Sequence, residues 1–277
     1  MNPRVNTFNK LKQRYEYSII LLKELVITDF KLRYQASALG YLWSILKPLL
    51  LFVILYVVFG VLIGATGKIP HYPVYLLLGV LMWNYFSEVT NIGATSIVAK
   101  GDLLRKLNFP KYVIVVAGSI SAFINLVINF CVLAGFMIVN GVELHVDSIM
   151  LIPLLLELFV LSIGMAFLLS ALYVKLRDVN YIWEVIMQAA FYATPIIYPL
   201  QLVVAKSHLA AQLLLLNPMA QIMQDARSVL ITDQTLSFEA LYGNGWLRLI
   251  PIGITVVIGL GAAVYFRKRS PFFAEEI

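Results

Sequence analysis

Residues 100–140 read KGDLLRKLNFPKYVIVVAGSISAFINLVINFCVLAGFMIVN, a short basic segment followed by a long apolar run. A helix needs about 20 mostly apolar residues to cross a bilayer. Residues 112–140 exceed that length and contain no charged side chain. Basic connections stay on the cytoplasmic side of a membrane. The stretch therefore predicts a spanning helix that starts at the cytoplasmic face.

The same alternation runs through all 277 residues. Of the 21 Lys and Arg residues, 17 lie in four segments: 4–47, 100–111, 175–177 and 267–269. The apolar runs lie near residues 49–65, 73–99, 112–140, 149–174, 180–199 and 249–266. They lack the period-two alternation of a barrel wall, which favours helices. The pattern predicts an all-α membrane protein, one domain over 1–277, with six spans and both termini cytoplasmic.

Composition agrees with a membrane protein and excludes several other classes. Apolar residues make up 61% of the chain, charged residues 13%, and the net charge is +6. Because the positive charge lies at the ends of apolar runs, it indicates topology and lipid headgroups rather than a nucleic-acid partner. The first apolar run begins more than 40 residues into the sequence, so no cleavable signal peptide is expected.

No motif in the sequence binds a metal, a cofactor or ATP. Cys131 is the single cysteine and lies in an apolar run, and the three histidines share no ligand spacing. The glycine-rich phosphate cradle ending in Lys-Ser/Thr is absent. We therefore expect no catalytic residue in this chain, and any energy for transport to come from a separate subunit.

An amphipathic helix is predicted over residues 10–34, before the first apolar run. Its apolar side chains recur every three or four residues at Leu11, Tyr15, Ile19, Leu22, Val26 and Phe30. Such a helix with a basic face lies in the membrane interface. It is either a surface anchor or a lever that contacts a cytosolic partner. Asp29 and Arg33 have the spacing of an ion pair on its flank.

Two connections on the expected cytoplasmic side have defined features. In 100–110, Asp102 is placed to cap a short helix with Leu103, Leu104 and Leu107 on one side and Arg105 and Lys106 on the other. Pro110 ends that helix. In 175–178, Arg177 marks the membrane boundary and Asp178 is placed to cap the fifth span. A short amphipathic helix suits docking into a groove of another protein.

The fifth apolar run ends abnormally, in Thr194-Pro-Ile-Ile-Tyr-Pro199. Pro195 and Pro199 each remove a backbone donor, so the helix must break here. The stretch 200–231 that follows contains Asn217-Pro218 and is too interrupted to span. Two short helices that dip back into the outer half of the membrane fit this pattern. The alternative is an ordinary outer loop with surface helices.

Carboxylates and aromatic residues within the runs admit two interpretations each. Glu88, Glu157 and Glu184 are costly in a bilayer and should face a cavity or a partner helix. Structural pairing is favoured over a proton relay for them. The aromatic side chains of interest are Trp83, Tyr85, Phe86, Phe191, Tyr192 and Tyr198. They are interface or packing residues, or they offer faces to sugar rings.

A set of motifs resembles one known family. Residues 33–48 contain Arg33-Tyr-x-x-Ser-x-Leu-Gly-x-Leu-Trp43-x-x-Leu-x-Pro48. This string is similar to the segment that leads into the first span in permeases of type-2 ABC exporters for polysaccharides, which export O-antigen, capsule or wall teichoic acid. Leu107-x-Phe-Pro110, Arg177-Asp178, the 194–199 string and Asn217-Pro218 also match that family in order.

The resemblance implies a homodimer in a bacterial cytoplasmic membrane, bound to two copies of an ATPase subunit that hold ATP and Mg. A lipid-linked glycan would pass through a channel between protomers. The ATPase contacts would be Asp102, Leu103, Leu104, Arg105, Lys106, Arg177 and Asp178. The substrate path would include Trp83, Tyr85, Phe86, Phe191, Tyr192 and Tyr198. The outer gate would include Pro195, Pro199, Asn217 and Pro218.

Three other classes stay open at this point. A permease for lipids or drugs would share the topology without the Trp43 and 194–199 motifs. A proton-driven transporter would need charged relays. A membrane scaffold would not explain the two re-entrant helices. The motifs do not name the glycan or its lipid carrier.

Overall fold

A computed structural model describes residues 18–29, 31, 39–65, 69–106, 109–143, 145–232 and 235–276. These residues form helices and the connections between them, and none of them belongs to a strand. The expected all-α class is therefore confirmed for this part of the chain.

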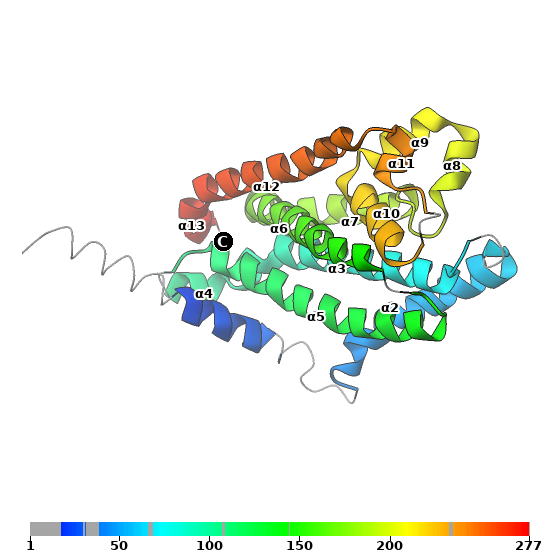
Figure 1. Ribbon diagram of the computed structural model, residues 1–277. Coiled ribbons are helices and arrows are strands. Elements are labelled where there is room, and N and C mark those ends of the chain that lie inside the picture. The colour runs from blue at the N-terminus through cyan, green and yellow to red at the C-terminus, as the bar shows by residue number, and fades with distance from the viewer. Residues whose placement is uncertain are drawn as a thin grey trace, which may run out of the picture.

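Six long helical stretches lie side by side in a bundle (Figure 1). They are α2 (Leu42–Leu55), which continues as the π-helix η1 (Tyr56–Leu62), α3 (Tyr72–Ala99), α5 (Tyr112–Val139), α6 (Leu151–Lys175), which follows the 3-10 turn η3 (Val146–Met150), α7 (Val179–Ala193) and α12 (Leu249–Arg269). The six apolar runs therefore correspond to six helical stretches.

Four stretches of the described chain are long and apolar enough to cross a membrane: Leu42–Leu62, Tyr112–Val139, Val146–Lys175 and Gly245–Phe272. The other two expected spans correspond to α3 and α7. Helix α3 has sufficient length but carries Asn84, Glu88 and Asn91, and α7 has only 15 residues. Length and composition alone thus support four spanning helices.

Two helix ends differ from the predicted ones. The first helix begins at Leu42 rather than near residue 49, and Pro48 lies inside it. Because Pro48 has no N–H, the carbonyl of Ser44 four residues earlier lacks its usual helical donor. Asn129 of α5 supplies one, since its Nδ2 donates to Ser44 O at 3.2 Å. The fifth helix ends at Ala193 rather than 199, directly before the Thr194-Pro195 break.

Helices α3 and α6 form the centre of the bundle, with α5 and α12 packed on their flanks. Helix α2 packs on α3 and α5, and α7 packs on α3 and α6. Small residues allow neighbouring helices to approach one another most closely. A Cβ at Gly93 of α3 would lie 2.4 Å from Ala166 Cβ, and one at Gly164 of α6 would lie 2.9 Å from Gly259 Cα. Close backbone approach through small residues is typical of helices in membranes.

The two ends of the bundle differ in character (Figure 1). At one end lie α4 (Gly101–Lys106), the 3-10 turn η5 (Ser270–Phe272) and α13 (Phe273–Glu276), together with the C-terminus. Helix α13 contacts both α4 and α6 there. We call this the basic end, because the described basic segments 100–106, 175–177 and 267–269 meet at it.

Short helices gather toward the opposite end, which we call the far end (Figure 1). They are α8 (Leu200–Lys206), α9 (His208–Leu215), α10 (Pro218–Leu230), α11 (Phe238–Tyr242) and the 3-10 turn η4 (Gly245–Arg248). The sequence predicted two short helices within 200–231, and the structure has three there. Ser207 makes the difference, because it separates α8 from α9 and its hydroxyl accepts a bond from Ala210 N.

The predicted interface helix is helical in residues 18–29, and 10–17, 30 and 32–34 lie outside the described residues. Leu21, Leu22 and Leu25 pack against the core, whereas Ile19 of the predicted apolar stripe is 51% exposed. The inward face is therefore rotated relative to the predicted stripe.

Candidate functional site

Helix α4 presents a charged face at the basic end. Asp102, Arg105 and Lys106 are exposed, Leu103 is half-buried and Leu104 is buried. Asp102 lies inside the first turn of α4 rather than at its cap. Its negative charge therefore stabilises the helix by interacting with the positive end of the helix dipole. Leu107, the third expected apolar residue, lies outside the described residues. The amphipathic arrangement anchors α4 and leaves its ionic side chains accessible.

An ion pair connects the N-terminal helix to this region. Lys100, the last residue before α4, donates to both carboxylate oxygens of Asp29 at 2.8 and 3.0 Å. The sequence paired Asp29 with Arg33, which lies outside the described residues. The observed partner is 71 residues away in sequence, so spacing along one helix could not identify it. The pair ties the 18–29 helix to the junction of α3 and α4.

The connection between α6 and α7 also lies at the basic end. Arg177 and Asp178 are both exposed, and the Arg177 guanidinium lies 5.1 Å from the centre of the Tyr173 ring. Asp178 occupies the N-cap position of α7, as predicted, but its side chain accepts no capping bond. Its backbone is already helical there, which explains the missing side-chain cap because a capping residue adopts an extended conformation.

The C-terminal turn packs under α12. The Phe273 ring meets Phe266 edge-on at 5.3 Å, and Lys111 Nζ donates to Ser270 O and lies 5.8 Å from the Phe273 ring centre. Burial lowers the pKa of Lys111, and Glu275 opposes that shift. These contacts fix the start of α5 to the end of α12.

The broken end of α7 is held by side chains from two other helices. The helix ends before Thr194, whose backbone is extended. The four successive carbonyls of residues 195–198 therefore have no helical donor. Arg227 of α10 donates to Pro195 O and, at 2.7 Å, to Ile196 O. Tyr72 and Tyr75 of α3 donate to Ile197 O and Tyr198 O, at 3.1 and 3.4 Å. We call this group of four donated bonds the carbonyl clasp.

Arg227 is the central residue of the clasp and is fully buried. Its Nε also donates to Tyr75 O, its Nη1 to Gln224 Oε1, and its guanidinium lies 3.5 Å from the Tyr75 ring centre. None of the ion pairs in the described part of the chain involves Arg227. Carbonyl dipoles and an aromatic face therefore take the place of a carboxylate in stabilising this cation.

Asn217 and Pro218 start α10, which carries Arg227. Asn217 Oδ1 accepts from Met219 N at 3.1 Å, and Pro218 occupies the first turn. Proline suits this position because a first-turn N–H has no helical acceptor. The two residues thus define where α10 begins. The clasped carbonyls begin with that of Pro195 and end directly before Pro199.

Asp225, on the same helix as Arg227, connects the far-end helices. Its Oδ2 accepts from Gln221 Nε2 at 2.7 Å and pairs with Arg248 Nη2 at 2.8 Å. Its Oδ1 accepts from Phe238 N at 3.0 Å at the start of α11. Asp225 is 3% exposed, so one carboxylate fixes α10 to α11 and to the residue before α12.

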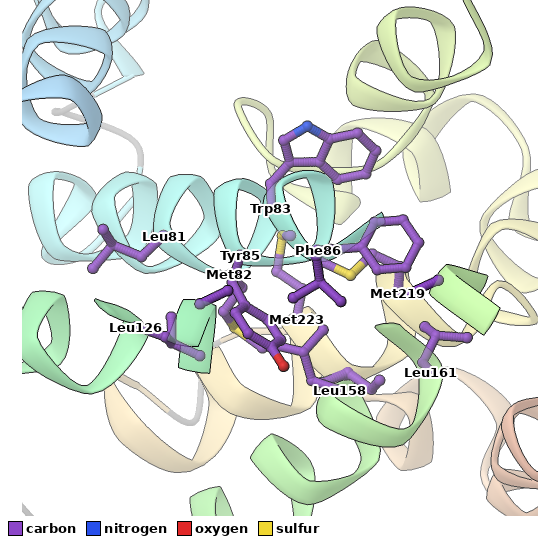
Figure 2. Packing of buried hydrophobic residues seen from close by; sticks show 14 of the residues in the cluster. Leu81, Met82, Trp83, Tyr85, Phe86, Leu126, Leu158, Leu161, Met219 and Met223 are labelled. Carbon is purple, nitrogen blue, oxygen red and sulfur yellow. The ribbon is translucent and has the colours of Figure 1, made fainter. Parts of the chain in front are cut away.

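The six aromatic residues expected along a substrate path do not share one surface. Trp83, Tyr85 and Phe86 are buried between helices, and Figure 2 shows Trp83 and Tyr85 leaving α3 on different sides. The Trp83 ring meets Phe191 edge-on at 5.8 Å. Tyr192 is 69% exposed, while Phe191 and Tyr198 are half-buried. Within one chain, Tyr192 is the one residue of the six that is exposed.

A cavity of about 720 Å³ lies between α2, α3 and α5. The residues that line it are Trp43, Ser44, Lys47, Pro48, Leu51, Leu81, Asn84, Tyr85, Ser87, Glu88, Asn91, Ile92, Ala122, Asn125, Leu126 and Asn129. Nine of these 16 residues have hydroxyl, amide or charged side chains, although all three helices are mainly apolar. Of these residues, Tyr85 was predicted to lie on the substrate path, Glu88 to face a cavity or a partner helix, and Trp43 and Pro48 belong to the family motif.

The three carboxylates have different surroundings. Glu88 lines the cavity and accepts a long bond of 3.5 Å from Asn125 Nδ2. Glu157 is half-buried on α6, within electrostatic reach of Arg248 and Asp225. Glu184 is exposed and accepts from Asn180 Nδ2 at 2.8 Å. No cluster of His, Cys, Asp and Glu in the described chain could hold a metal ion.

A family model described as ABC-2 type transporter matches residues 20–231. The chain belongs to this family. It is 28% identical over 271 residues to the "O-antigen export system permease protein RfbA" of Myxococcus xanthus, covering 96% of this chain and 98% of that protein. A Klebsiella pneumoniae protein of the same name is 28% identical over 270 residues, with 96% and 98% covered. The Escherichia coli "Polysialic acid transport protein KpsM" is 21% identical over 247 residues, with 89% and 93% covered.

The resemblance seen in the motifs is thus confirmed at the level of the ABC-2 family. Within this ABC-2 chain, sequence reasoning missed the clasp donors Tyr72, Tyr75 and Arg227 and the Asp29 partner Lys100. One signal for Arg227 was present, because it is one of only four basic residues outside the basic segments. A buried cation far from the basic end needs a specific set of acceptors.

Proposed function

We propose that this chain is the membrane-embedded subunit of an ATP-driven exporter that moves a lipid-linked polysaccharide across a bacterial cytoplasmic membrane. The observation that carries the proposal is the similarity to O-antigen export permeases over 96% of the chain. The similarity to a polysialic acid transport protein favours a glycan over a drug or an ordinary lipid as cargo.

Six spans give the arrangement that suits this role. Helix α7 is about 22 Å long, since a helix rises 1.5 Å per residue, and a hydrocarbon core is about 30 Å thick. The non-helical residues 194–199 complete the crossing, and the carbonyl clasp satisfies four of their carbonyls where water is absent. Helix α3 crosses inside the bundle, which shields its polar side chains. Both termini then lie on the cytoplasmic side, with the basic end.

The basic end is the surface that meets an ATPase subunit. Helix α4 exposes Asp102, Arg105 and Lys106, and Arg177 and Asp178 add charges from a neighbouring connection. ATP and Mg are held by that partner, which provides the nucleotide chemistry. Leu103 and Leu104 transmit a movement of α4 to the core, because Leu104 belongs to the core cluster and Leu103 packs against it.

A second copy of the chain completes the conduit. Helix α7 buries Trp183 and Met187 and exposes Tyr181, Ile182 and Val185 on its remaining surface. That surface meets the partner protomer or lines the path between protomers, together with Tyr192. The residues from Pro195 to Pro199, and Asn217 with Pro218, form the gate at the far end.

The test is genetic and biochemical. Deleting the chain should abolish surface polysaccharide and leave lipid-linked glycan inside the cell, and plasmid-borne chain should restore export. The purified chain should retain an ATPase subunit and contain two copies of itself. Unchanged surface polymer in the deletion strain, or export by the chain without a nucleotide-hydrolysing partner, would rule the proposal out.

A further inference from the structure

Two cavities lie along the contact of α6 and α12, which run beside each other to the basic end (Figure 1). The larger one, of about 530 Å³, lies where α12 ends and α5 begins. The smaller one, of about 200 Å³, lies further from the basic end between the same two helices. Phe167 and Ala263 line both cavities, so the two adjoin. We call them together the α6–α12 groove.

The larger cavity is basic. Lys111 and Arg267 line it, and none of the described residues around it is acidic. Arg267 is exposed, and its guanidinium has no ion pair or hydrogen bond with any group that the structure describes. Of the two carboxylates near this end, Glu276 pairs with Arg269 at 2.8 Å and Glu275 acts on Lys111. A guanidinium without a carboxylate partner at a cavity favours an anionic ligand.

The smaller cavity is apolar. All the residues that line it are glycine, alanine, valine, leucine, isoleucine or phenylalanine. Val256 and Leu260 in its lining are 45% and 66% exposed, so the cavity opens on the outer surface of the bundle. The distance along α12 from Arg267 to Val256 is about 16 Å, since a helix rises 1.5 Å per residue. Because α12 is long and apolar enough to cross the membrane, the apolar cavity lies at the depth of the acyl chains and the basic one at their boundary.

The two cavities together select an amphiphilic ligand. A soluble anion at Arg267 would leave the apolar cavity unfilled, and an acyl chain alone would leave the guanidinium without a partner. A phospholipid has both parts at the required depths, and basic pockets between spanning helices bind the headgroups of anionic lipids. Phosphatidylethanolamine carries an ammonium of its own, which Lys111 and Arg267 repel. Phosphatidylglycerol has a phosphate without such a group and therefore fits better.

We propose that the α6–α12 groove binds one anionic phospholipid of the phosphatidylglycerol type, which stays with the protein and is not its cargo. The inference goes beyond the proposed function and does not depend on what the chain exports. Arg267 donates to the phosphate. Lys111 adds its charge and one N–H, since its Nζ already donates to Ser270 O and Pro271 O. One acyl chain lies against Ala263 and extends between α6 and α12, so the lipid joins the end of α12 to the start of α5.

The experiment uses the full chain, purified in detergent and depleted of lipid, and native mass spectrometry counts the bound molecules. The probes are dioleoyl phosphatidylglycerol, dioleoyl phosphatidylethanolamine, undecaprenyl phosphate and glycerol 3-phosphate. One phosphatidylglycerol should bind per chain, about tenfold more tightly than phosphatidylethanolamine, and glycerol 3-phosphate should not bind. Arg267→Gln removes the unpaired cation, and Ala263→Leu narrows the junction of the two cavities. Each should weaken phosphatidylglycerol binding about tenfold, equivalent to about 1.4 kcal/mol.

Lys268→Gln is the matched control, because it removes the same charge from a neighbouring exposed residue outside the groove and should leave binding unchanged. Equal binding of the two phospholipids, or equal weakening by Arg267→Gln and Lys268→Gln, would indicate general attraction to a basic surface and overturn the proposal. Binding that neither groove variant weakens would overturn it too. Undecaprenyl phosphate that binds as tightly as phosphatidylglycerol, and is lost in the same variants, would assign the groove to a glycan carrier instead. Loss of a bound second copy of the chain in Ala263→Leu, with lipid binding unchanged, would make the groove a protomer interface.

Discussion

The guanidinium of Arg227 occupies the space that a side chain at position 79 would need. A Cβ on Gly79 would lie 2.4 Å from Arg227 Nη2 and 3.3 Å from its Cζ. Gly79 lies on α3 between Tyr75 and Trp83, and Arg227 reaches it from α10. The absence of a side chain at one residue thus allows a buried cation to bind the end of another helix.

Gly79→Ala should therefore destabilise the protein. The added methyl group displaces Arg227 from its acceptors, and overpacking of this kind costs about 1–3 kcal/mol. Thermal unfolding of the purified chain measures the loss. Gly135→Ala on α5 is the control, because a Cβ there has nothing within 4 Å. Equal melting temperatures for the two variants would contradict the packing argument.

Arg227→Met should release the broken end of α7. The methionine fills part of the volume but donates nothing to Pro195 O or Ile196 O, and bonds from a charged donor contribute about 1.5–3 kcal/mol each. Proteolysis near 194–199 should become faster and export should fall. Arg227→Lys should give an intermediate result, since a single ammonium cannot reproduce the guanidinium fork. A methionine variant as protease-resistant as the unsubstituted chain would exclude this role.

Reversing the charge of α4 should weaken contact with the ATPase subunit. Arg105→Glu with Lys106→Glu changes exposed side chains only, so insertion and stability should persist while co-purified ATPase falls by on the order of tenfold. Lys206→Glu, an exposed lysine at the far end, is the matched control. Undiminished ATPase recovery in the double variant would place the contact elsewhere.

The Asp29–Lys100 pair should make a small contribution to stability. Its side chains are 20% and 24% exposed, and partly exposed pairs contribute about 0.2–1 kcal/mol. Asp29→Lys alone should lower the melting temperature slightly and weaken the attachment of the 18–29 helix. Adding Lys100→Asp should restore it by re-forming the pair with exchanged charges. A double variant no better than the single one would argue against a direct pair.

Substitution of a buried aromatic residue and of an exposed one should have different effects on stability and export. Phe86→Ala removes a buried ring and should cost about 3–5 kcal/mol of stability. Tyr192→Ala removes an exposed ring, so the melting temperature should hold while glycan export falls. Quantified surface polymer and thermal unfolding of both variants distinguish packing from transport. Normal export in the Tyr192 variant would remove this residue from the substrate path.

The sequence predicted those features that depend on local composition. Apolar runs located all six long helices, and Thr194-Pro195 located the end of α7 to within a few residues. Asn217 and Pro218 marked the start of α10 because capping and proline geometry are local. The first helix was predicted too short because the apolar run begins near residue 49, whereas α2 begins at Leu42 and contains Pro48, where Asn129 donates to the carbonyl that lacks a helical partner.

Contacts between distant residues were beyond the reach of the sequence. The distances in sequence from Arg227 to Tyr75, and from Tyr72 to Ile197, exceed 120 residues. Burial of Trp83, Tyr85 and Phe86 likewise depends on which helices surround α3 rather than on their own spacing. The polar cavity arises only when α2, α3 and α5 are assembled, because each contributes a few polar residues to it.

The carbonyl clasp also restricts how the far end can move. Sliding residues 195–198 away from α3 and α10 would strip donors from four neighbouring carbonyls at once, in a region where water cannot replace them. Any widening at this end must then carry α10, the stretch that follows α7 and the start of α3 together, because α3 donates two of the four bonds.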